Sequence, residues 1–187
     1  PYDVIKLMQN SGVLKHIIFN NNNIEKIKSL NKINKISYLI DFSTRLAILL
    51  NEKNLNKFSK NLKLSKNDEI KVKKIVNLNK NFSFKDFKKN KIKYIYYYGY
   101  DICFSLLIIN FANFPNRTNE KDYLKIISSL KKLKIPKLPV FGKDIVKLGI
   151  KPGPNVGKIL ELIENWWILN NFLPSRKECL QKLKEYN

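Results

Sequence analysis

Apolar residues recur at intervals of three to four positions along almost the whole chain, and no segment alternates convincingly between apolar and polar residues. A repeat near 3.6 residues is typical of an amphipathic helix, whereas alternation is typical of a half-buried strand. We therefore predict an all-α fold. The predicted helices begin near residues 3, 41, 65 and 83, and others cover about 24–40, 52–62, 91–113, 120–134, 143–148, 154–170 and 175–186.

Capping residues mark the ends of several of these helices. Ser65 is followed by two carboxylates, which the helix macrodipole favours in a first turn. The segment Ser175-Arg176-Lys177-Glu178 is a complete capping box. Gly12 stands where a left-handed residue often ends a helix. These signals support the helical assignment independently of the apolar repeat.

The most apolar predicted helix covers about 91–113. Its apolar residues fall on one stripe and predict the central buried helix of the fold. They are Ile95, Tyr98, Ile102, Leu106 and Ile109.

An extended linker is predicted to interrupt the helical pattern at 135–139, where Pro136 and Pro139 stand three residues apart. Proline removes a backbone donor and pushes the preceding residue towards an extended conformation. We therefore place a boundary here, between a helical body over 1–134 and a helical tail over 135–187.

The charge is strongly positive, with 36 Lys and Arg against 15 Asp and Glu, a formal net charge of +21. Such a field attracts nucleic acid or an anionic membrane surface. Almost all of the basic residues are lysine and asparagine is abundant, so an AT-rich genome is an equally good explanation for much of the excess. The longest run without charge, Ile102 to Asn116, is shorter than the roughly 20 residues that span a bilayer. We expect no membrane-spanning segment.

Cys103, Cys179 and His16 are far apart in sequence and show no metal-ligand or redox spacing. We expect two buried free thiols and a cytoplasmic protein with no metal site. The first residues lack the order of a signal peptide, and the chain starts at Pro1 rather than Met, which predicts a fragment of a longer protein.

The segment 137–160 holds the clearest candidate for a binding site. Glycine-rich turns present two predicted helix N-termini beside Lys143, Lys151 and Lys158. Free backbone N–H groups and lysines suit phosphate, although the glycines, Gly157 among them, can equally serve close helix packing. The candidate phosphate-binding residues are Lys143, Lys151, Gly153, Lys158 and Arg176.

Trp166 and Trp167 lie on the next predicted helix. Tryptophan faces can stack on unpaired bases. Trp167, however, continues an apolar stripe through Ile163, and Trp166 flanks it. We predict core packing for both rings.

The same segment resembles the C-terminal region of class II CCA-adding tRNA nucleotidyltransferases and their poly(A) polymerase relatives. The residues that carry the resemblance are Phe141-Gly142-Lys143-Asp144-Ile145, Leu148-Gly149, Lys151-Pro152-Gly153-Pro154, Gly157, Trp166-Trp167-Ile168 and Phe172. Phe141 departs from the pattern, which has Ser at this position. A looser similarity extends upstream over residues 2–14, 62–69 and 98–101.

The resemblance implies a multi-helix tRNA-binding body followed by a small helical tail, with the catalytic head absent. The parent enzyme would add C, C and A to the tRNA 3′ end from CTP and ATP, using Mg²⁺ in that head. The implied partners are tRNA and the head, and this chain itself would bind no cofactor or small molecule. Two alternatives stay open: a stand-alone helical RNA-binding protein, and the C-terminal portion of a related poly(A) polymerase.

No residue of this chain is predicted to be catalytic. Nucleotidyl transfer in this family needs a Gly-Ser loop and paired carboxylates that hold two metal ions. The pair Glu120 and Asp122 has the right spacing but no such loop, and stabilisation of a helix N-terminus explains it better. We expect the parent chain to be an enzyme and this chain alone to be inactive.

Overall fold

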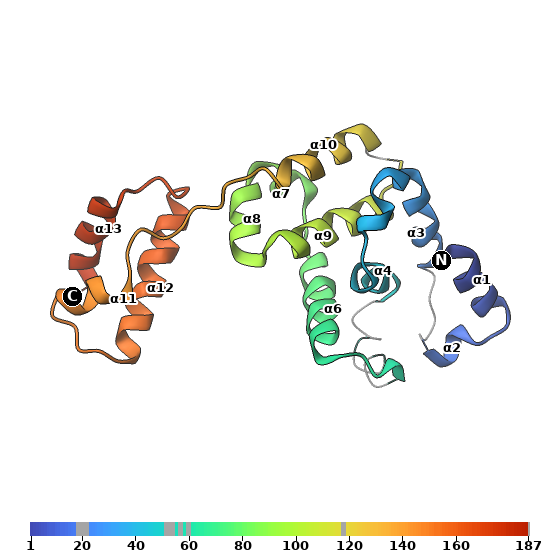
Figure 1. Cartoon of the computed structure of the whole chain (residues 1–187), viewed down its shortest axis with the longest axis horizontal. Coiled ribbons are helices and arrows are strands. Elements are labelled where there is room, and N and C mark those ends of the chain that lie inside the picture. The colour runs from blue at the N-terminus through green and yellow to red at the C-terminus, as the bar shows by residue number, and fades with distance from the viewer. Residues whose placement is uncertain (18–22, 51–54, 56–57, 59–60, 117–118, 187) are drawn as a thin grey trace. The chain divides into compact units, whose positions relative to one another are not determined.

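The computed structural model describes residues 1–17, 23–50, 55, 58, 61–116 and 119–186 (Figure 1). The chain divides into two compact units, Pro1–Leu133 and Lys134–Asn187. Every regular element of the described residues is helical, with no strand, so the predicted all-α fold is confirmed.

The first unit contains most of the helices. Their order is α1 (Tyr2–Asn10), α2 (Leu14–Ile17), α3 (Ile24–Ser29), η1 (Leu30–Leu39), α4 (Phe42–Leu49), α6 (Lys66–Asn79), α7 (Phe84–Lys89), α8 (Lys91–Tyr98), α9 (Tyr100–Asn113) and α10 (Glu120–Leu130). The helix predicted over 52–62 falls largely outside the described residues.

Helix α9 lies at the centre of this unit and packs against α3, α4, α6, α8 and α10 (Figure 1). Its side chains from Ile102 to Ile109 are all buried. A helix that is apolar on every side needs neighbours on every side, and these five helices provide them. The prediction of a central buried helix is confirmed for this half of the segment.

The predicted continuous helix over 91–113 is wrong, because it breaks at Gly99. This residue has φ 80° and ψ 165°, a conformation that only glycine adopts readily. Helices α8 and α9 consequently meet at a bend of 119°. No single helix among the described residues is long and apolar enough to cross a membrane, and α8 and α9 meet that criterion only as this bent pair.

The predicted helix over 24–40 also divides, into α3 and the 3₁₀ element η1. Inside η1, Ile33 has φ −111° and ψ 41°, which is not helical. Its side chain is buried, so the kink lies at a residue of the core.

Side-chain caps begin several helices as the sequence predicts. Asp41 accepts a hydrogen bond from the backbone N–H of Thr44 at 2.8 Å, and Ser65 accepts one from that of Asp68 at 3.1 Å. Each cap satisfies a donor that has no partner inside its helix. The cap of α10 by Asn119 was not predicted.

The second unit consists of an extended segment and three helices, shown from orange to red in Figure 1. The helices are α11 (Gly142–Lys147), α12 (Pro154–Leu169) and α13 (Arg176–Leu183), and the short η2 (Lys184–Tyr186) follows. Helix α12 packs against both α11 and α13. The buried side chains of this unit are Val140, Asp144, Ile145, Ile163, Trp167, Ile168, Cys179 and Leu183.

Candidate nucleic-acid interface

The carboxylate of Asp144 connects three segments of the second unit. One oxygen, Oδ2, accepts a hydrogen bond from the backbone N–H of Phe141 at 2.9 Å. The other, Oδ1, accepts one from Nη2 of Arg176 at 2.7 Å. Arg176 also donates through Nη1 to the backbone oxygen of Pro139. The extended segment, the start of α11 and the start of α13 are thereby joined.

The surroundings of Asp144 favour its ionised form. The hydrogen bond from Arg176 lowers the pKa of the Asp144 carboxyl, and the backbone N–H of Phe141 lowers it further. Burial acts in the opposite direction and is outweighed. The side chain is only 6% exposed, so the ion pair is shielded on the carboxylate side. Asp144 therefore stays charged at neutral pH and keeps Arg176 in place.

A glycine turn connects α11 to α12. Gly149 follows α11 with φ 95°, and Gly153 precedes α12 with φ 156° and ψ −168°, a region that is almost exclusive to glycine. Pro154 then occupies the first turn of α12, where a missing N–H costs nothing. The turn between the two helices is exposed from Lys151 to Asn155.

The three predicted lysines of this segment are accessible to solvent. Lys143 lies on α11, Lys151 in the glycine turn and Lys158 in the second turn of α12. None of them forms an ion pair with a carboxylate in the part of the chain that the structure describes. Their ammonium groups can therefore meet an anionic ligand, and the charge of Lys143 also lowers the pKa of the Asp144 carboxyl.

Close packing explains only one of the glycines of this segment. A Cβ added to Gly142 would lie 3.3 Å from Cγ1 of Val156, so this glycine allows α11 to approach α12. At Gly153 and Gly157 an added Cβ would meet no described atom within 4 Å. The expectation that Gly157 admits a neighbouring backbone is wrong for the described residues. No described atom covers the backbone at Gly153 and Gly157 on this side, so a ligand can approach it there.

The guanidinium of Arg176 is already engaged in hydrogen bonds within the second unit. It bonds Asp144 and Pro139, and its side chain is 46% exposed. An arginine has five N–H donors, so some remain for a ligand. The main role of Arg176 in the structure is therefore to stabilise the fold of this unit. Its contact with RNA stays a prediction.

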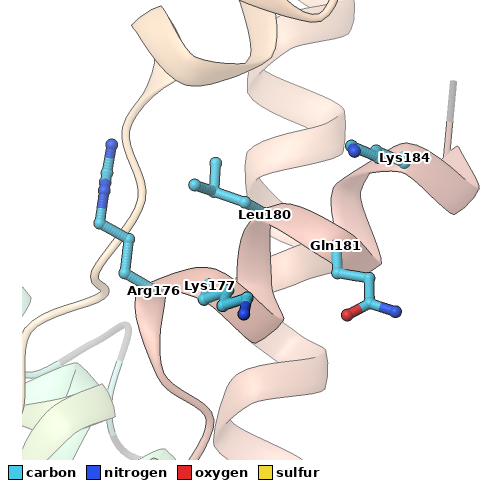
Figure 2. A pocket seen from close by; sticks show the side chains of 5 residues that line it. All are labelled: Arg176, Lys177, Leu180, Gln181 and Lys184. Carbon is cyan, nitrogen blue, oxygen red and sulfur yellow. The ribbon is translucent and has the colours of Figure 1, made fainter.

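Figure 2 shows a depression along α13 that the sequence did not predict. It is lined by Arg176, Lys177, Leu180, Gln181 and Lys184. Leu180 and Lys184 follow Arg176 by four and eight positions, so the three residues share one helix face. This spacing of Arg176 and Lys184 is visible in the sequence.

The two tryptophans differ in their environment. Trp167 is 3% exposed, and its indole N–H donates to the backbone oxygen of Pro174 at 3.0 Å. Its ring also contacts that of Phe172, with centroids 5.1 Å apart. The prediction of core packing is confirmed for Trp167, whereas Trp166 is half-buried. Trp167 is therefore too enclosed for a base to stack on it.

The carboxylate pair and the two cysteines considered above lie outside residues 137–160 in the sequence. Glu120 and Asp122 both stand in the first turn of α10, as the helix-dipole explanation requires. Cys103 and Cys179 are buried free thiols, as predicted, and burial raises the pKa of Cys103 to about 12. The described residues contain no group of three or more His, Cys, Asp or Glu side chains that could hold a metal ion.

Comparison with known proteins agrees with the resemblance seen in the sequence. The family described as tRNA nucleotidyltransferase domain 2 matches residues 40–183. The mitochondrial CCA tRNA nucleotidyltransferase 1 of Danio rerio is 33% identical over 61 residues, which cover 33% of this chain and 14% of that protein. The resemblance to the body and tail region of CCA-adding enzymes is thereby confirmed. From the match over most of its length, this chain belongs to the tRNA nucleotidyltransferase domain 2 family.

Proposed function

We propose that this chain is the tRNA-binding C-terminal portion of a CCA-adding tRNA nucleotidyltransferase. In this proposal it holds the tRNA while a separate catalytic head, with its Mg²⁺ ions, adds C, C and A to the 3′ end. The proposed RNA-binding residues are Lys143, Lys151, Gly153, Lys158 and Arg176. The two buried thiols fit a reducing compartment such as the cytoplasm.

One observation carries this proposal. Lys143 precedes, Lys151 lies within and Lys158 follows an exposed glycine turn, and a Cβ added at Gly153 or Gly157 would meet no described atom within 4 Å. Such a surface can approach a phosphate backbone closely, and α12 is long enough for its dipole to favour an anion at its N-terminus. Contacts of this kind fix the position of an RNA without reading its sequence.

The proposal predicts that this chain has no nucleotidyltransferase activity by itself. The chain contains no Gly-Ser loop followed by a carboxylate pair, which the two-metal reaction requires. Incubation with tRNA lacking its 3′ CCA, together with Mg²⁺, CTP and ATP, should leave the RNA unchanged. Extension by the purified chain, seen on a sequencing gel, would contradict this prediction.

A second prediction locates the tRNA-binding surface. Replacing Lys143, Lys151 and Lys158 together by alanine should weaken tRNA binding. It should also reduce the slope of log affinity against log salt by about 0.9 for each duplex phosphate that is no longer neutralised. Fluorescence anisotropy with labelled tRNA over a range of salt concentrations measures both quantities.

The matched control removes three exposed lysines from the region of α10, namely Lys121, Lys125 and Lys132. Both variants lose the same charge, so non-specific attraction falls equally in the two. Equal losses of affinity and of salt slope would show that binding is diffuse and that the proposed site is wrong.

A further inference from the structure

We propose that Phe141 is a stacking platform for an unpaired nucleobase of the bound RNA. This inference rests on the proposed function and adds a contact of a different chemical kind to it. The lysines would bind phosphates, which every part of an RNA carries. A stacking residue contacts the face of a base, which is accessible where the RNA is single-stranded or where a base is flipped out of a helix.

The ring of Phe141 is exposed to solvent. Phe141 is 56% exposed, although it stands between Val140, which is buried, and Gly142, which packs against α12. A phenylalanine gains free energy by burial, so a ring held this far in solvent contributes little to the core of its unit. A single exposed apolar residue is common, so the neighbours of Phe141 decide whether its ring suits a binding site.

The backbone of Phe141 is held by two hydrogen bonds to Asp144. Its N–H donates to Asp144 at 2.9 Å, and its carbonyl accepts from the N–H of Asp144 at the same distance. Because the Asp144 carboxylate is fixed by Arg176 as well, the ring projects from a rigid point. A fixed backbone leaves only the side-chain torsions of Phe141 to be ordered when a ligand stacks on its ring.

Two positively charged groups lie close to the ring of Phe141. Nζ of Lys143 lies 5.7 Å from the ring centroid, and Cζ of Arg176 lies 6.0 Å from it. With both cations in place, more than half of the surface of Phe141 is still exposed to solvent. The phosphates of a nucleotide whose base stacks here would lie near these two cations. The planar guanidinium of an arginine is itself a surface on which bases stack. This combination fits an unpaired nucleotide better than a neutral apolar partner.

The test compares two RNA probes, a tRNA transcript and a long blunt-ended RNA duplex. Phe141→Ala should weaken tRNA binding by about 5- to 150-fold, the usual range for one stacked base. The salt slope should stay unchanged, because no phosphate-binding group is removed. Binding of the duplex should hardly change. Phe141→Tyr, which keeps an aromatic face, should retain tRNA affinity, whereas Phe141→Leu should reduce it.

Phe42→Ala is the matched control, because Phe42 is 55% exposed and lies in the first unit. Thermal unfolding of each variant shows whether its fold is intact, and the Tyr and Leu variants keep the test decisive if the Ala variant is unstable. Equal tRNA affinities of Phe141→Ala and Phe42→Ala would overturn the stacking proposal. The same result would leave the proposed function standing if the lysine variants still differ, so the two failures are distinguishable.

Discussion

Replacing Trp167 by alanine is expected to unfold the second unit of the chain. The indole is 3% exposed, packs against Phe172 and donates a hydrogen bond to Pro174. Removing a buried tryptophan costs about 3–5 kcal/mol, and a unit as small as Lys134–Asn187 has little stability to lose. Far-UV circular dichroism during urea unfolding should show the loss of a helical fraction at low denaturant, and tRNA binding should weaken with it.

The adjacent Trp166 provides the control. Its side chain is half-buried, so Trp166→Ala removes less buried surface from the same helix. The unfolding midpoint of this variant should lie clearly above that of Trp167→Ala. Similar midpoints for the two variants would show that Trp167 is not the anchor of this unit.

Removal of the Arg176 guanidinium should give the second-largest effect on stability. Arg176→Ala leaves the shielded carboxylate of Asp144 with only the N–H of Phe141 as a partner among the hydrogen bonds described above. A hydrogen bond to a charged group contributes about 1.5–3 kcal/mol. Because Arg176 is itself half-exposed, solvent screening reduces the expected loss of stability to about 1–2 kcal/mol. Urea unfolding at neutral pH measures this difference.

The same pair predicts a pH dependence with a definite sign. The folded state lowers the pKa of Asp144, so its ionised form stabilises folding above the pKa of an unfolded aspartate, about 3.9. This contribution disappears as pH falls through the lower, folded pKa. The stability difference between the wild type and Arg176→Ala should therefore be full at neutral pH and shrink in acid.

Lys177→Ala is a suitable control for the pH experiment, because Lys177 is an exposed neighbour of Arg176. Its replacement removes the same charge and should change stability little at any pH. A difference between Arg176→Ala and the wild type that stays constant into acid would show that the ion pair is not its source.

The sequence predicts those features of the fold that depend on local interactions. Ser175 accepts from the N–H of Glu178, and the Glu178 carboxylate accepts from the N–H of Ser175 at 2.7 Å, as the capping box requires. Both partners lie within four residues of each other, so their spacing is visible in the sequence. The core position of Trp167 is predictable for the same reason, since it follows from the helical repeat.

Features that depend on distant partners could not be predicted in this way. The apolar repeat continues across Gly99, so the repeat gives no sign that the chain bends there, although this glycine permits the bend. Arg176 and Asp144 are 32 residues apart, so the sequence shows an isolated arginine where the structure has an ion pair. The exposed ring of Phe141 also depends on the course of the chain around it, although its departure from the Ser of the family pattern was a local signal.

Hydrogen–deuterium exchange tests most directly whether tRNA lies against the glycine turn and its lysines. Backbone amides of an exposed turn exchange rapidly unless a ligand covers them. We expect added tRNA to slow exchange in peptides covering 141–158, with little change in peptides covering 119–132 around α10. Equal protection of both regions, or protection of the α10 region alone, would contradict the account.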